Sequence, residues 1–380
     1  MHPNVPHLRF PEFHGEWEKH GLSEYLDFKN GLNPDSKRFG KGIKFISVMD
    51  ILNNPVITYD CIRASVQATD AEISSFSVEN GDILFQRSSE TLEDVGRANV
   101  YIDDKVAVFG GFVIRGKKKA NYNPLFFRYL LSSPYARKRI IPMGAGAQHF
   151  NIGQEGLSKV LLNFPSIEEQ TKIASLLHLL DERIATQSKL IEDLKKLRSA
   201  ISENLFKAVK GDVVILCEIC EIIKGKQING EFLSEKGKYY VMNGGTEPSG
   251  YYSDCNVEAN TISISEGGNS CGYVQFNSSP FWSGGHCYTI QKLAENVDNM
   301  YLYHYLKSKE DAIMKLRIGS GLPNIQKKDL AMFKIKLPNV EQQKSISTFL
   351  SSLERKAEIE EIIQNAMLKE KQYLLEQMFI

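Results

Sequence analysis

One segment of this 380-residue chain occurs twice, and this repeat constrains the fold more than any other feature. The stretch FNIGQEGLSKVLLNFPSIEEQTKIASLLHLLDE, which begins at Phe150, returns as PNIQKKDLAMFKIKLPNVEQQKSISTFLSSLER, which begins at Pro323. The two copies align without a gap at an offset of 173 residues, and the register continues to Phe206 and Phe379. A repeat of this length indicates two equivalent units within one chain.

Each copy continues, after a proline, into a segment with the spacing of a long amphipathic helix. Ser166 and Asn339 are expected to cap these helices, because Glu or Gln follows each of them three residues later. In the first helix, apolar residues recur in steps of three and four from Ile173 to Leu205, the heptad pattern of a coiled-coil seam. The second helix begins alike, but its phase shifts further on. We expect an antiparallel pair of helices rather than two unrelated ones.

Short β-like runs, separated by Gly, Asn and Ser, precede each helix. The predicted fold class is α+β, with two globular domains separated by two long antiparallel helices. These helices form a coiled-coil-like spacer and give the chain approximate internal two-fold symmetry. The expected boundaries are an N-terminal segment 1–20, a first domain 21–165, a central helix 166–210, a second domain 211–338 and a C-terminal helix 339–380.

The composition argues against several classes of protein. A hydrophobic fraction of 42% is that of a folded chain, and no apolar run is long enough and free enough of charge to cross a membrane. No apolar segment typical of a secretory signal lies near the N-terminus. Six cysteines are too few for a disulfide scaffold. We therefore expect reduced thiols, a cytoplasmic location and no membrane partner.

The charges balance, with 46 basic and 46 acidic residues, but they are unevenly distributed. Residues 105–154 contain nine Lys or Arg and no Asp or Glu, whereas residues 212–310 contain twelve acids against seven lysines. Basic side chains and open backbone N–H groups of glycine loops both suit phosphate oxygens, although a charge run can also be a merely solvated face. The predicted DNA phosphate contacts are Arg115, Lys117, Lys118, Lys119, Arg137, Lys138, Arg139, Gly144, Gly146, Gln148, Lys315, Arg317, Gly319 and Gly321.

No catalytic motif accompanies these residues. The chain lacks a Walker A loop, a Rossmann glycine fingerprint, His-Glu-x-x-His and Gly-x-Ser-x-Gly. Cys217 and Cys220 form a Cys-x-x-Cys pair, but they lie in an apolar run, where free cysteine packs as a small hydrophobe. We predict no catalytic residue, no metal site and no cofactor in this chain. A self-contained methyltransferase or endonuclease, and a helical scaffold whose domains bind protein, remain the alternatives.

The arrangement resembles the specificity subunits of type I restriction-modification systems over essentially the whole chain. The resemblance rests on the opening LRFPEFHGEW and on a pattern used twice: glycine loop, Asn-Ile, strand, Pro, then Glu-x-Gln or Glu-Gln-Gln before a long helix. It implies that the two domains each recognise half of a bipartite, asymmetric sequence in double-stranded DNA. It also implies that two modification (methyltransferase) subunits, and possibly two restriction (nuclease-translocase) subunits, join the chain for adenine methylation and restriction. S-adenosylmethionine, ATP and Mg²⁺ would then belong to the partners.

A second apolar stripe lies on the first long helix, outside the heptad seam. It consists of Leu176, Leu179, Leu190 and Leu197. A stripe of this length is expected to be covered by another surface. The family resemblance implies that modification subunits cover it, and the alternative is packing against the chain's own domains.

Overall fold

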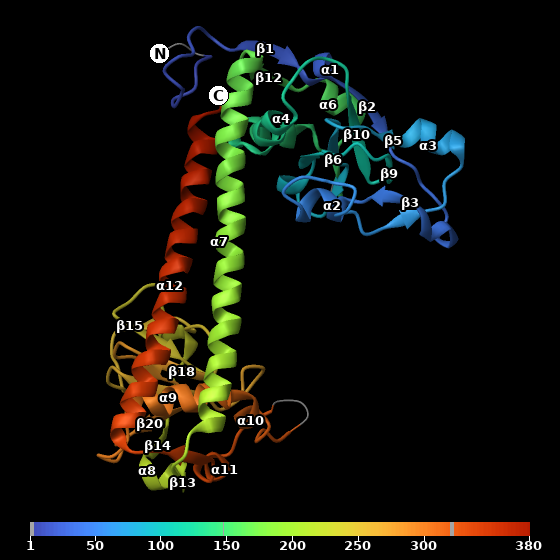
Figure 1. Cartoon of the computed structure of the whole chain (residues 1–380). Coiled ribbons are helices and arrows are strands. Elements are labelled where there is room, and N and C mark those ends of the chain that lie inside the picture. The colour runs from blue at the N-terminus through green and yellow to red at the C-terminus, as the bar shows by residue number, and fades with distance from the viewer. Residues whose placement is uncertain (1–3, 147, 320–322) are drawn as a thin grey trace. The chain divides into compact units, whose positions relative to one another are not determined.

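The structure is a computed structural model that describes residues 4–146, 148–319 and 323–380. The chain divides into two compact units. Unit 1 contains the residues up to 188 together with 363–380, and unit 2 contains residues 189–362. Two long helices, α7 (Ile167–Ala208) and α12 (Val340–Gln377), are green and red in Figure 1. Each of them is divided, with one part in unit 1 and the other part in unit 2.

Unit 1 is built on a four-stranded antiparallel sheet in the order β2-β10-β6-β8. A second sheet has the order β4-β3-β9-β5, in which β3 and β9 run parallel, and β1 pairs separately with β12. The strands are β1 (Glu18–Gly21), β2 (Leu26–Asn30), β3 (Phe39–Ile46), β4 (Ser65–Val66), β5 (Ser77–Val78), β6 (Ile83–Gln86), β7 (Ser88–Ser89), β8 (Ala98–Val100), β9 (Ala107–Phe109), β10 (Val113–Lys118), β11 (Phe150–Asn151) and β12 (Leu161–Phe164). The helices are α1 (Leu22–Tyr25), α2 (Val48–Asn53), α3 (Asp70–Phe76), α4 (Pro124–Ser132), α5 (Pro134–Ile140) and α6 (Gln154–Ser158).

Unit 2 repeats this plan with a four-stranded antiparallel sheet in the order β14-β20-β17-β18. A smaller sheet has the order β16-β15-β19, in which β15 and β19 run parallel, and β13 pairs with β21. The strands are β13 (Asp212–Ile215), β14 (Glu221–Lys224), β15 (Tyr239–Met242), β16 (Tyr251–Tyr252), β17 (Thr261–Ser265), β18 (Val274–Asn277), β19 (Trp282–Ser283), β20 (Cys287–Gln291) and β21 (Lys334–Leu337). The helices are α8 (Leu216–Ile219), α9 (Asn299–Ser308), α10 (Glu310–Met314) and α11 (Lys327–Ala331).

The two units thus share one α+β topology, including the single parallel pairing in the smaller sheet. The predicted fold class is confirmed. The predicted helix caps are also present, since Ser166 Oγ accepts from Glu169 N (3.4 Å) and Asn339 Oδ1 accepts from Gln342 N (2.9 Å).

A buried glutamine near the start of each long helix joins that helix to its unit. Gln170 accepts a hydrogen bond from Asn123 N (3.1 Å), and its amide donates to Pro165 O (3.1 Å). Gln343 accepts from Asp298 N (2.8 Å) and donates to Pro338 O (2.8 Å) and Asn296 O (2.9 Å). The acceptor bonds reach the N-cap residues of α4 and α9. We call these two side chains the amide latches, and they explain the glutamine that both copies of the repeat place in the first turn.

Within each unit, α7 and α12 contact one another in antiparallel fashion through a carboxylate and a cation. In unit 1, Asp181 on α7 pairs with Lys371 on α12 (2.5 Å). In unit 2, Glu354 on α12 pairs with Arg198 on α7 (2.8 Å). Both pairs are related by the offset of 173 residues, with the roles of the helices exchanged. The repeat therefore joins the two helices by one acid–base pair in each unit, with the acid on α7 in unit 1 and on α12 in unit 2. A tyrosine hydroxyl also donates to each carboxylate, from Tyr129 in unit 1 (2.8 Å) and Tyr303 in unit 2 (3.1 Å).

The far end of each long helix completes a hydrophobic core. Phe379, from the C-terminal end of the chain, packs against Trp17 and Phe126 in the core of unit 1. Its repeat equivalent, Phe206, packs against Tyr301 and Tyr305 in the core of unit 2. All six side chains are at least 95% buried. Each globular part is therefore closed by residues from both long helices.

The opening segment LRFPEFHGEW is anchored on unit 1. Arg9 forms a bidentate ion pair with Glu169, with Nε–Oε1 and Nη2–Oε2 distances of 2.8 and 2.7 Å. The indole of Trp17 also donates to Glu169 (3.3 Å), and Leu8 N donates to Gln377 O (2.9 Å). The role of this segment in the structure is to join the start of α7 to the end of α12.

Candidate nucleic-acid interface

The first basic cluster lies at and after the C-terminal end of β10, an inner strand of the main sheet of unit 1. Lys117 pairs with Glu79 (2.8 Å), and Lys118 donates to Tyr122 O (3.1 Å). Lys119 is exposed. Lysines at this end of the strand can reach a phosphate by exchanging these surface partners, because exposed ion pairs contribute little.

Two of the predicted phosphate contacts, Arg115 and Arg137, donate hydrogen bonds to backbone carbonyls of unit 1. Arg115 is 6% exposed; its guanidinium donates to Ser77 O and lies over the Phe109 ring, 5.5 Å from its centroid. Arg137 donates to Glu93 O (2.8 Å) and Val95 O (2.7 Å), and burial lowers its pKa to about 10. Both guanidinium groups therefore already donate to backbone carbonyls of unit 1, which makes them less available to a phosphate than the exposed lysines.

The neighbours of Arg137 on α5 face solvent. Lys138 and Arg139 are exposed, and the Arg139 guanidinium stacks on the Tyr135 ring, 3.8 Å from its centroid. A guanidinium held flat on an aromatic ring keeps its outer N–H donors available. Lys138 and Arg139 therefore stay in the predicted set.

The first glycine loop is a hairpin that projects from unit 1. Ala145 and Asn151 exchange two backbone hydrogen bonds of 2.9 Å, and Ile152 N donates to Arg87 O (2.9 Å). Gly146 has a φ of +146°, and a Cβ there would lie 2.0 Å from a backbone oxygen, so only glycine fits. Three of the predicted residues belong to this hairpin: Gly144 is half-buried, and Gly146 and Gln148 are exposed.

The second glycine loop repeats this hairpin in unit 2. Ile318 and Asn324 exchange backbone hydrogen bonds of 2.8 and 3.0 Å, and Ile325 N donates to Glu266 O (2.8 Å). Gly319 has a φ of +98°. The predicted contacts Lys315, Arg317 and Gly319 are exposed, and Gly321 lies outside the described residues. Structure thus explains the Asn-Ile pair of the repeat, since Asn closes the hairpin and the buried Ile fixes it to the sheet.

Beside each hairpin lies a surface groove at an equivalent place in the fold. Groove 1, of about 470 Å³, is lined by residues 32–34, 47–49, 88 and 110–113, with Phe39 and Phe45. Groove 2, of about 680 Å³, is lined by residues 243–245, 266–270 and 323–324, with Lys224, Ser249 and His286. The sequence alone did not identify these grooves as candidate sites.

Matching backbone contacts establish that the grooves are equivalent. Arg87 N donates to Phe112 O (2.9 Å) in unit 1, and Glu266 N donates to His286 O (2.9 Å) in unit 2. The turn before β10 and β20 is Gly-Gly in both units. A Cβ on the second glycine would collide with a side chain, with Asn33 in unit 1 (1.7 Å) and Gln227 in unit 2 (2.4 Å). The signal in the sequence was the pair FGGF and SGGH, residues 109–112 and 283–286.

The two grooves present opposite chemistry on this shared frame. Groove 1 is apolar at its rim, where Phe112 is 69% exposed, Met49 60% and Phe39 43%. Groove 2 instead carries amide, imidazole and carboxylate groups, among them Asn243, Asn269, His286 and Glu266. Two domains that bind different ligands require different side chains on an equivalent backbone, and the two grooves have this arrangement.

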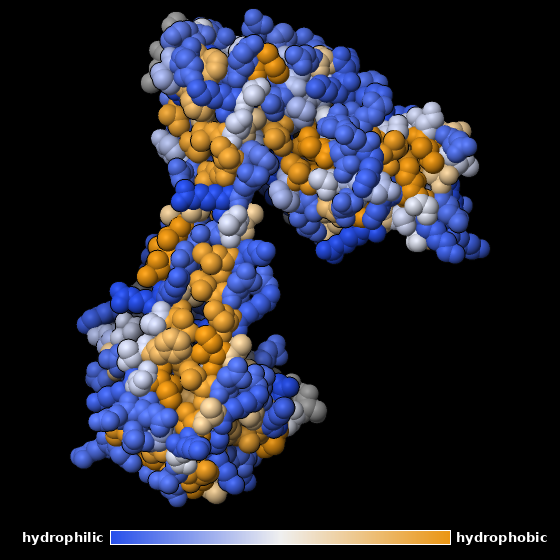
Figure 2. All heavy atoms as spheres, viewed as in Figure 1, coloured by the Kyte–Doolittle hydropathy of each residue, from blue (hydrophilic) through white to orange (hydrophobic). Residues whose placement is uncertain are grey.

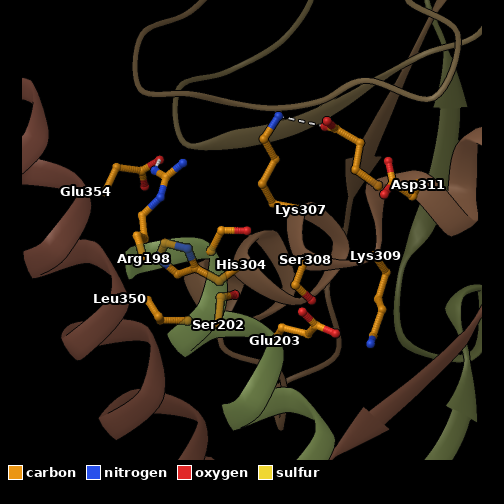
Figure 3. A pocket seen from close by; sticks show the side chains of 12 residues that line it. Arg198, Ser202, Glu203, His304, Lys307, Ser308, Lys309, Asp311, Leu350 and Glu354 are labelled. Atoms are coloured by element: carbon orange, nitrogen blue, oxygen red, sulfur yellow. Dashed lines mark hydrogen bonds and ion pairs between the residues drawn. The ribbon is translucent and has the colours of Figure 1, made fainter. Parts of the chain in front are cut away.

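A further pocket in unit 2, of about 440 Å³, lies between the end of α7, the start of α12 and helices α9 and α10 (Figure 3). Its charges are largely paired, since Arg198 contacts Glu354 (2.8 Å) and Lys307 contacts Glu310 (2.6 Å). His304 lines this pocket beside these groups, and burial lowers its pKa to about 4. The pocket therefore has no excess of positive charge that would attract a nucleic acid.

The leucines of the predicted partner stripe are mostly exposed. Leu179, Leu190 and Leu197 are 64%, 40% and 52% exposed, whereas Leu176 is half-buried against the core of unit 1. Helix α12 adds Phe349, Ile359, Ile362 and Leu368, which are between 46% and 67% exposed. Figure 2 shows apolar residues along the long helices in unit 2.

The described residues form neither a metal-binding cluster nor a membrane-spanning helix. No group of three or more His, Cys, Asp or Glu that could hold a metal ion occurs among residues 4–146, 148–319 and 323–380. Cys217 is exposed, and burial raises the pKa of the Cys220 thiol to about 12. No helix in the described part of the chain is both long and apolar enough to cross a membrane.

Comparisons with known proteins agree with this geometry. A 24% identical sequence, the putative type I restriction enzyme MjaX specificity subunit of Methanocaldococcus jannaschii, matches over 94% of this chain and 91% of its own length. A putative type I specificity subunit of Mycoplasma pneumoniae is 34% identical over 145 residues, and this match spans 38% of this chain and 38% of that relative.

Solved structures show the same fold. A type I restriction-modification system S subunit from M. genitalium aligns with a TM-score of 0.66 at 19% identity, over 99% of both chains. A chain from a structure of the type I R-M system aligns with a TM-score of 0.58 at 16% identity, over 94% of this chain and 96% of that one. The sequence profile of the type I restriction modification DNA specificity domain matches residues 14–196 and 209–369, so this chain belongs to the type I restriction-modification specificity family and carries its domain twice.

Proposed function

We propose that this chain is the sequence-reading subunit of a type I restriction-modification complex. Unit 1 and unit 2 each read one half of a bipartite, asymmetric DNA target, and the long helices set the gap between the halves. The chain has no active site of its own. Modification subunits carry out adenine methylation with S-adenosylmethionine, and restriction subunits, where present, use ATP and Mg²⁺. The complex works in the cytoplasm.

The observation that carries this proposal is the pair of equivalent grooves. Both lie beside a glycine hairpin and include the residue that follows a Gly-Gly turn, Phe112 or His286, yet one groove is apolar and the other polar. Two domains that served only as protein adaptors would not need equivalent sites of different chemistry. Readers of two different half-sites do need them, since each base pair presents its own pattern of donors, acceptors and methyl groups.

The exposed apolar stripe supports the partner role. Leu190 and Leu197 on α7, and Phe349, Ile359 and Ile362 on α12, are exposed apolar residues of unit 2, and exposed apolar residues on a helix suit packing against a partner helix. We propose that two modification subunits dock there, related by the approximate two-fold axis of the chain.

The test is a methylation map. The chain is expressed with a modification subunit, and methylated adenines are located across a genome. We expect two short specified sequences separated by an unspecified gap, and no such methylation by the modification subunit alone. A continuous target, or methylation that does not depend on this chain, would refute the proposal.

An insertion tests the spacer. Four extra residues after Gln187 and after Glu360 lengthen each helix by about 6 Å. The gap in the target should grow by one or two base pairs while both half-sites stay the same. Altered half-sites with an unaltered gap would contradict a spacing role.

A further inference from the structure

A buried carboxylate forms part of groove 2. Glu266 follows β17 and is 7% exposed. Its Oε1 accepts from Lys224 Nζ (2.6 Å) and from Tyr288 Oη (3.1 Å). Its Oε2 is buried and accepts no hydrogen bond from any residue that the structure describes. The imidazole of His286 lies beside this oxygen, with Nδ1 3.8 Å from Oε2.

This arrangement leaves half of a carboxylate without a donor. A buried carboxylate oxygen is costly unless a donor reaches it, and most such atoms in proteins have one. Glu266 lines a groove of about 680 Å³ whose other walls include Asn243, Asn269 and His286. The groove is open to a ligand from outside the chain, and a donor on that ligand would satisfy Oε2.

Building on the proposed function, we propose that Glu266 reads one base of the half-site bound by unit 2, by accepting a hydrogen bond from an exocyclic amino group. An ionised carboxylate can only accept hydrogen bonds. In the major groove, N4 of cytosine and N6 of adenine donate, whereas N7 and O6 of guanine and O4 of thymine accept. Oε2 therefore favours cytosine or adenine at that position and repels guanine and thymine.

The equivalent position in unit 1 has the opposite hydrogen-bond character. Arg87 occupies the same place in the backbone pattern, and its guanidinium contacts Gly111 O (3.3 Å) at the edge of groove 1. Arginine only donates, and its preferred base partner is guanine. One structural position thus carries a pure donor in one unit and a pure acceptor in the other, as expected of a position that determines which base is read.

The first experiment changes the protein. Glu266→Gln keeps the shape of the side chain but replaces an obligate acceptor with an amide that can also donate. The variant chain is assembled with modification subunits, and methylation of a randomised target library is sequenced. We expect the preference for cytosine or adenine to fall on the order of tenfold at one position of one half-site. The other half-site and the gap should not change.

A control variant separates base reading from general damage. Glu295→Gln makes the same chemical change at an exposed carboxylate outside groove 2. This control should retain the base preference of the unmodified chain. A loss of preference in Glu295→Gln equal to that in Glu266→Gln would indicate general distortion and overturn the proposal.

The second experiment changes the DNA, and its first arm uses only the unmodified chain. Each cytosine or adenine of the target is replaced in turn by the base analogue that lacks the exocyclic amino group, and binding to the complex of the unmodified chain is measured. One replacement should weaken binding on the order of tenfold, and the same replacement should have no further effect with Glu266→Gln. If every amino group can be removed without loss, or if the two losses add, Glu266 does not read a base.

The outcomes distinguish this inference from the proposed function. Absence of bipartite methylation by the unmodified chain would refute the proposed function. A bipartite target that keeps its full base preference in Glu266→Gln would refute this inference alone.

Discussion

The amide latch of unit 2 provides the most direct test of how the long helices are joined to the domains. Gln343 is fully buried and makes three hydrogen bonds, to Asp298 N, Pro338 O and Asn296 O. Gln343→Met has nearly the same volume but none of these bonds. Each buried group left unpaired costs about 1–3 kcal/mol, and the three do not add fully, so we expect a loss of roughly 2–5 kcal/mol in the unfolding free energy of unit 2.

The neighbouring glutamine supplies a matched control. Gln342 is exposed, and Gln342→Met changes the same atoms without breaking a buried bond. Stability is followed in urea by hydrogen exchange with mass spectrometry, which reports on the two units separately through their peptides. With an m-value of about 2 kcal/mol per molar urea, the midpoint of unit 2 should fall by roughly 1–2.5 M in Gln343→Met. Equal stability of the two variants would show that the latch does not hold the domain to the helix.

Three further predictions concern charge, assembly and pH. Replacing Lys117, Lys118 and Lys119 by Ala should weaken binding to all DNA sequences alike and reduce the slope of log affinity against log salt by up to about three; an unchanged slope in a salt titration would exclude phosphate contact. Leu190→Asp with Leu197→Asp should leave the isolated chain folded but prevent assembly with modification subunits, because each buried leucine contributes about 1.5–3 kcal/mol and a buried charge costs more. Light scattering that shows a full-mass complex would contradict docking at this stripe. Burial lowers the pKa of His304 to about 4, so the unfolded chain binds the proton more readily and stability is lost as pH falls from about 6.5 towards 4. Unit 2 should lose about 2 kcal/mol between pH 7 and pH 5 in urea titrations, and His304→Gln should abolish this contribution.

The repeat and the long helices could be predicted from the sequence because their signals are local. Heptad spacing, the Ser166 and Asn339 caps and the glutamines of the first turn all recur at the same offset. The equivalence of the domains upstream of the helices was not predicted in the same detail. The two domains share backbone hydrogen bonds and a Gly-Gly turn, but the side chains at matching positions differ, as Phe112 and His286 do. A comparison of side-chain types therefore does not reveal the equivalence.

The predicted phosphate contacts show a second limit of sequence reasoning. A run of positive charge does not reveal the direction of each side chain. Arg115 stands in the middle of β10 and is directed into the protein toward Ser77, while Lys119, just after the strand, is exposed. In the sequence, Glu266 is only one of the twelve acids between residues 212 and 310. Its position in groove 2 depends on contacts between β17, β14 and the second hairpin, which are far apart in the sequence and leave no local pattern.

The closure of the unit 1 core by Phe379 has a consequence for synthesis on the ribosome. Nearly all of unit 1 has been made by residue 188, but its core is complete only after residues 374–379 have emerged. At 5–20 residues per second, roughly 10–40 s separate these two points. Unit 2, whose residues form one continuous stretch, can close during that interval. The part of the chain that is made first is therefore finished last, and its apolar surface around Trp17 and Phe126 needs protection for that time.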